Sequence, residues 1–188
     1  MDFTSVESEA TISSEFPETT KANADGYTTD ENARPGYRTL YIVSFIPSRL
    51  FPAHWAMWVP HQRDNQGTLI SAQGDPGTGF VHEFLREYNP KEDERKPWVK
   101  AVAQIEERYI LDPPEEARST QAYNELEQVG FSIPAPGKSL RSASQQGPMK
   151  RVAIQNCQTW LADFVKRLIE KGLIGKEAHP VLDECPKN

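Results

Sequence analysis

The sequence predicts a single α+β domain, in which a small antiparallel sheet carries packed helices. Segments rich in β-branched and aromatic residues follow one another from Tyr37 onward and are separated by turn residues. A strongly amphipathic helix follows Asn156. A chain of 188 residues is long enough for one domain with its own core and too short for two of ordinary size.

The domain is predicted to span residues 37–175, between an N-terminal tail at 1–36 and a C-terminal tail at 176–188. The first 36 residues are mostly Thr, Ser, Glu, Asp and Asn, with eight acidic and two basic side chains. They therefore carry the whole formal net charge of −6. This composition buries too little apolar surface to offset the entropy of ordering, so we expect the segment to be disordered.

Five strands are expected between residues 37 and 110. Residues 37–46 are β-branched and aromatic, and residues 54–59 alternate with a period of two. Residues 68–73, after a polar turn, form the antiparallel partner of that strand, and residues 80–84 form another strand. The pattern of residues 98–110 fits a strand or a helix, and we favour the strand.

A helix is expected to start near Pro113 and to end at Gly130, with an apolar stripe at Tyr123, Leu126 and Val129. The loop at residues 134–148, rich in Pro, Ser and Gly, could act as a lid.

A last short strand or an extended entry is expected at residues 149–155, before the amphipathic helix. Asn156 is the predicted N-cap of that helix, which runs from Cys157 to about Lys171 and stops at Gly172. Its apolar spacing turns Cys157 toward the core.

Several function classes are excluded by composition. Beyond the acidic tail the chain is neutral, so it lacks the positive surface that nucleic acids require. The histidines lack the spacing of a metal site, no cofactor motif is present, and no apolar run suits an integral membrane segment. Cys157 and Cys185 lie in different settings and are not expected to form a disulfide. We therefore expect a cytoplasmic protein without metal or cofactor.

Cys157 and His54 are the residues that indicate chemistry. A helix N-terminus favours a thiolate over a thiol, and an imidazole within hydrogen-bond reach would complete a nucleophile. Backbone amides at the helix start could stabilise an oxyanion. Taken alone, a cysteine on an apolar helix face and a histidine at the start of a strand are each more often structural.

Two sequence motifs favour a catalytic role for Cys157 and His54. The run His54-Trp55-Ala56-Met57-Trp58-Val59 resembles the His-Trp-Ala-aromatic motif of the lecithin:retinol acyltransferase and phospholipase A/acyltransferase families. The sequence Asn156-Cys157-Gln158 is similar to their Asn-Cys-Glu-His helix opening. The resemblance implies a circularly permuted papain-like fold, in which the histidine strand precedes the cysteine helix. Residues 40–170 also resemble a group of small fungal proteins with similar paired motifs.

The resemblance implies a cysteine-dependent hydrolase or acyltransferase that attacks an ester, thioester or amide. Cys157 would be the nucleophile and His54 the base, and the residue that orients the imidazole would be Ser71 or Gln73, where the families have histidine. His82 is a weaker candidate for that role. The substrate would be a small-molecule or peptide acyl donor. The alternative is a catalytically silent interaction module on the same fold.

Three further residues, Trp58, Trp55 and Asn156, are predicted to bind substrate. Trp58 is expected on the His54 face of its strand, where it could line an acyl or aromatic pocket.

Overall fold

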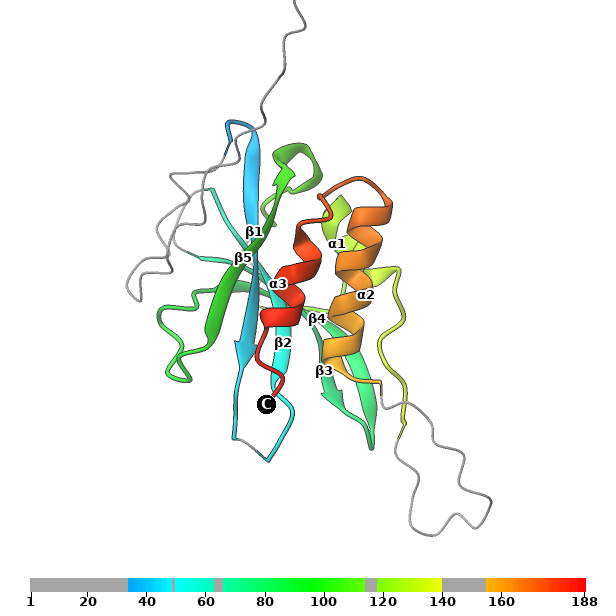
Figure 1. Cartoon of the computed structure of the whole chain (residues 1–188). Helices are drawn as coiled ribbons and strands as arrows, with labels where there is room; N and C mark the ends of the chain where they lie inside the picture. The colour runs from blue at the N-terminus through cyan, green and yellow to red at the C-terminus, as the bar shows by residue number, and fades with distance from the viewer. Residues whose placement is uncertain (1–33, 49, 63–65, 114–117, 140–154) are drawn as a thin grey trace, which may run out of the picture.

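An antiparallel sheet with strand order β5-β1-β2-β3-β4-β6 is the framework of the protein (Figure 1). The computed structural model describes residues 34–48, 50–62, 66–113, 118–139 and 155–188. The strands are β1 (Tyr37–Phe45), β2 (His54–Pro60), β3 (Gly67–Asp75), β4 (Gly79–Tyr88), β5 (Trp98–Glu106) and β6 (Arg118–Ser119). The helices are α1 (Glu125–Phe131), α2 (Cys157–Glu170) and α3 (Ala178–Glu184), and a 3-10 turn covers Glu107–Tyr109.

The α+β class and the five strands expected between residues 37 and 110 are confirmed. The ambiguous residues 98–110 form β5 followed by the 3-10 turn, so the strand was the right alternative there. The strand predicted at residues 80–84 is longer at both ends and pairs with β3 over most of its length. Strand β6 was not predicted, because two residues are too few to show a period.

The sheet separates two clusters of buried side chains. Helices α1, α2 and α3 cover one face (Figure 1), and the larger cluster lies between them and the sheet. It includes Trp55, Met57 and Val59 of β2, whereas Ala56 and Trp58 belong to the smaller cluster on the other face. The predicted alternation of β2 is therefore confirmed, and both faces of the strand are buried.

Helix α1 begins later than predicted. Asn124 is its N-cap, and the Asn124 side chain accepts a hydrogen bond from the Glu127 amide at 3.0 Å. A start near Pro113 is wrong, because the chain first adds β6 to the sheet edge beside β4. Gly130 lies inside the helix, where a Cβ atom would come within 3.1 Å of the Phe164 ring. Its lack of a side chain thus allows α1 to approach α2 closely.

The segment 176–188 was predicted to be a polar tail and instead contains helix α3. Ala178, Leu182 and Cys185 are buried in the main cluster, at a spacing that puts them on one side of a helical turn. An apolar stripe this short is easily missed in a polar stretch. The acidic segment 1–33, residues 140–154 of the proposed lid and entry strand, and residues 114–117 lie outside the described residues.

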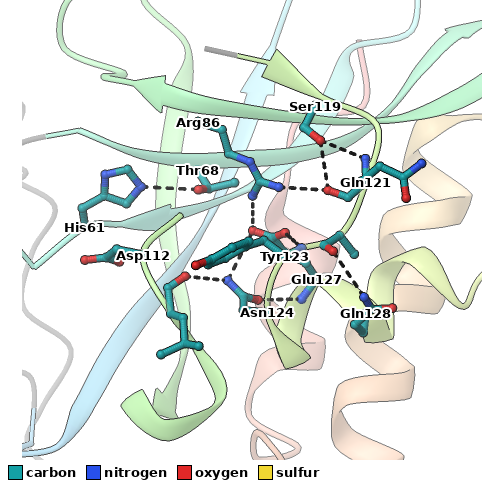
Figure 2. A network of polar contacts seen from close by, with 12 residues as sticks. His61, Thr68, Arg86, Asp112, Ser119, Gln121, Tyr123, Asn124, Glu127 and Gln128 are labelled. Carbon is teal, nitrogen blue, oxygen red and sulfur yellow. Dashed lines mark hydrogen bonds and ion pairs between the residues drawn. The ribbon is translucent and has the colours of Figure 1, made fainter. Parts of the chain in front are cut away.

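A buried ion pair between Arg86 of β4 and Glu127 of α1 attaches α1 to the sheet (Figure 2). Both side chains are almost inaccessible to solvent. The Glu127 carboxylate also accepts hydrogen bonds from the Tyr123 amide at 2.6 Å and the Asn124 side chain at 3.3 Å. Arg86 makes a second bond, to the Gln121 carbonyl at 3.0 Å. Such a network is stabilising only while every member is paired.

Replacing Arg86 with methionine should therefore destabilise the fold strongly. The change leaves the Glu127 carboxylate buried without its cation, and the expected loss in the free energy of unfolding is about 3–5 kcal/mol. Urea unfolding measures it. The control is Arg108→Ala, which removes an exposed ion pair with Glu106 and should cost less than about 1 kcal/mol. Equal losses in the two variants would contradict the role given to the buried pair.

Candidate active site

The first turn of α2 is held by a capping box, as the sequence predicts. The Asn156 side chain accepts hydrogen bonds from the amides of Gln158 at 3.0 Å and Thr159 at 3.1 Å. The Thr159 hydroxyl in turn accepts a bond from the Asn156 amide at 2.9 Å. This reciprocal pairing fixes where the helix begins and therefore where Cys157 lies. Asn156 acts here as a cap, and its side-chain oxygen is fully engaged by the helix.

The Cys157 sulfur lies against the backbone of β2, on both sides of His54. It is 3.9 Å from the carbonyl oxygen of Ala53 and receives a hydrogen bond from the amide of Trp55. The sulfur reaches this edge because β2 and β3 pair only from Met57 onward. The first residues of β2 are thus open on the β3 side, and the start of α2 fills the opening.

Burial raises the pKa of the Cys157 thiol above its usual value. Hydrogen bonds from the backbone amides of Trp55, Gln158 and Cys157 lower it, but they do not offset the loss of solvent. The expectation of a lowered pKa is therefore wrong. A thiol that is only 7% exposed loses more hydration as an anion than the helix start returns.

His54 is neutral at physiological pH. Burial, followed by the positive charge of Arg95, lowers its pKa from 6.5 to about 4. The imidazole stacks on Phe45 with a centroid distance of 5.8 Å, and Arg95 lies over the same Phe45 ring at 4.1 Å. Phe45 belongs to the cluster on the sheet face away from the helices, so the ring of His54 is on that face too.

The structure brings Cys157 and His54 to the same end of the sheet without joining them. Within the described residues, neither the sulfur nor the imidazole takes part in a hydrogen bond with the other. The sulfur lies at the open edge of β2 beside the first turn of α2, whereas the imidazole lies on the sheet face away from the helices.

In the described part of the chain, no hydrogen bond joins either predicted orienting residue to His54. Ser71 is buried in β3 and pairs with Glu83 of β4, and Gln73 is exposed farther along the same strand. The ladder between β2 and β3 stops before either residue would face His54. His82 bonds the Ile133 carbonyl at 2.8 Å and packs on Trp160, so it links β4 to the helices.

The two tryptophans of β2 have different surroundings. The Trp58 indole is buried against Tyr41 and donates a hydrogen bond to the Tyr88 carbonyl at 3.1 Å, so it is a core residue. Trp55 donates instead to the Pro186 carbonyl at 2.6 Å and lines a cavity of about 510 Å³ between α2 and α3.

Gln158 is the site residue that sequence reasoning did not single out. Its side-chain amide donates to the Ala53 carbonyl at 2.8 Å and to the Lys187 carbonyl at 2.9 Å. The available signal was its place directly after Cys157, where a polar side chain on the first turn faces the same strand edge. Its partner Lys187 could not be foreseen, because the contact uses a backbone oxygen.

The chain belongs to a family of unknown function (DUF6540), whose model matches residues 40–175. The match includes Cys157, His54 and Gln158 and ends before α3. The searches of curated proteins and of solved structures gave no match. In the described ranges, no helix is long and apolar enough to cross a membrane, and no three His, Cys, Asp or Glu side chains are grouped to hold a metal ion.

The lowered pKa of His54 predicts a loss of stability in mild acid. Between pH 6.5 and about 4 the unfolded chain binds a proton at this position that the folded chain does not, so the free energy of unfolding falls as the pH falls. The full effect is about 3 kcal/mol. Replacing His54 with phenylalanine, which keeps an aromatic ring beside Phe45, should remove it.

Urea unfolding at pH 7 and at pH 4.5 compares the wild type with His54→Phe and with His179→Phe, which changes an exposed histidine. The His179 variant should keep the full pH dependence. If the His54 variant loses as much stability as the wild type on acidification, His54 is not the buried neutral base described here.

Proposed function

We propose that the protein is a cysteine-dependent hydrolase or acyltransferase that forms an acyl-enzyme on Cys157. The observation that carries this proposal is the position of the sulfur at the start of α2, against the backbone on both sides of His54. The order of a histidine strand before a cysteine helix, within an α+β sheet domain, is what the resemblance to permuted papain-like acyltransferases implies.

The proposed reaction starts from neutral partners. As the sulfur attacks the acyl carbon, the neutral imidazole takes the thiol proton, and the resulting imidazolium protonates the leaving oxygen, sulfur or nitrogen. Water or a second acceptor then attacks the thioester, gives a proton to the imidazole, and releases Cys157 with its proton. Because no hydrogen bond joins the two groups in this structure, the proposal requires that they come together when substrate binds.

A catalytically silent interaction module is the second candidate. The raised pKa of Cys157 and the missing hydrogen-bond partner for the His54 ring among the described residues favour it. In this case Asn156 and Cys157 would serve to cap α2 and to close the edge of β2.

Mass spectrometry after incubation with activated acyl donors discriminates the two candidates. With a panel of p-nitrophenyl esters, thioesters and anilides, the enzyme should gain the acyl mass on the peptide that contains Cys157. Cys157→Ala should abolish the gain, and His54→Phe should slow it by about 10²–10⁴-fold because the base is lost.

Cys185→Ala is the matched control, since it removes the other buried free thiol and leaves the proposed nucleophile in place. Acylation that persists in Cys157→Ala, or no acylation by any donor class, would contradict the enzyme and leave the interaction module.

A further inference from the structure

The segment 185–188, which follows α3, lies along the start of β2 (Figure 1). The Cys185 side chain is buried in the main cluster, and Pro186 and Lys187 are held through their backbone carbonyls. The Pro186 carbonyl accepts hydrogen bonds from the Ser44 hydroxyl at 3.1 Å and the Trp55 indole at 2.6 Å. The Lys187 carbonyl accepts bonds from the Ala53 amide and the Gln158 side chain, both at 2.9 Å. We call these four donors, on Ser44, Ala53, Trp55 and Gln158, the carbonyl clamp.

The clamp donates to main-chain carbonyls and not to side chains. Each of its donors meets a peptide carbonyl, and the two carbonyls belong to consecutive residues. Lys187 itself is exposed, and Cys185 has an extended backbone with φ −66° and ψ 128°. An extended peptide of different sequence would offer the same acceptors in the same places.

The clamp also adjoins free volume. Trp55, Gln158 and Lys187 all border the cavity of about 510 Å³ between α2 and α3. Charged side chains of both signs, including Asp163 and Lys166, border it as well. A bound peptide therefore has space for side chains next to the point where its backbone is gripped.

Cys157 lies beside the clamp. Its sulfur is 3.9 Å from the Ala53 carbonyl, and Gln158, the next residue, donates both to that carbonyl and to the one of Lys187. The Lys187 carbonyl is thus bound by the residue that directly follows the proposed nucleophile.

We propose that the carbonyl clamp is a binding site for extended polypeptide, and that segment 185–188 occupies it in this structure as a built-in ligand. If the protein is the proposed enzyme, its substrate would then be a peptide or protein. Only this chemical step rests on the proposed function. Binding itself does not require a reactive thiol.

Competition between the built-in segment and a free peptide tests the inference. The probe is a fluorescein-labelled peptide with the sequence of residues 183–188 and serine in place of the cysteine. The key variant is the full chain with Pro186→Gly and Lys187→Gly, which makes the built-in segment more costly to order. Fluorescence anisotropy should give a Kd at least tenfold lower for this variant than for the wild type, because the competing segment is weakened.

The donors are tested in the same glycine background. Gln158→Met keeps the length of the side chain and removes the amide donor, and Trp55→Phe removes the indole donor; each should raise the Kd at least tenfold. Gln128→Met, which makes the same change on the exposed surface of α1, should leave the Kd unchanged. Lys187→Gly alone is a milder second variant, for which an intermediate Kd is expected.

Peptide binding that is equal in the wild type and both glycine variants, or that survives Gln158→Met and Trp55→Phe, would overturn the inference. The clamp would then serve only to pack the segment that follows α3. Repeating the titration with Cys157→Ala separates the two proposals. Binding that persists there, with no acylation of the wild type by any donor, would refute the enzyme and support the clamp.

Discussion

The backbone amides and carbonyls at the buried start of β2 need hydrogen-bond partners. The residues that supply these partners determine where Cys157, Gln158 and Lys187 lie. Ala53 and Trp55 are almost inaccessible to solvent, yet β3 does not pair with this part of β2. A buried amide or carbonyl without a partner costs about 1–3 kcal/mol. The Ala53 carbonyl accepts a hydrogen bond from the Gln158 side chain, and the Trp55 amide donates one to the Cys157 sulfur. The Ala53 amide donates to the Lys187 carbonyl. The thiol is therefore placed by backbone pairing as much as by apolar packing.

The same burial sets the ionisation of both candidate catalytic groups. It raises the pKa of Cys157 and lowers that of His54, so each group is held in its neutral form. A resting thiolate–imidazolium pair would place two charges where the sheet and helix exclude water. The proposed mechanism therefore moves the proton during attack, so that no charged pair has to exist beforehand.

Periodic features could be predicted from the sequence, and contacts through the backbone could not. The alternation of residues 54–59 and the Asn156 cap are local patterns, so the faces of β2 and the start of α2 were foreseen. The start of α1 at Asn124 depends on β6 pairing with β4 first, which a local pattern does not show. The approach of Cys157 to the edge of β2 depends on where the β2–β3 ladder stops, which a local pattern does not show either.

The strength of the clamp decides whether its occupant can exchange. Four hydrogen bonds contribute about 4 kcal/mol in total, taking about 1 kcal/mol for each. Ordering the backbone of Pro186 and Lys187 costs about 2–4 kcal/mol. The balance is close to zero, so these two residues are held weakly once Cys185 is anchored in the core. A peptide that makes additional contacts in the neighbouring cavity would then displace Pro186 and Lys187. The four donors of the carbonyl clamp would form the same hydrogen bonds with the carbonyls of that peptide.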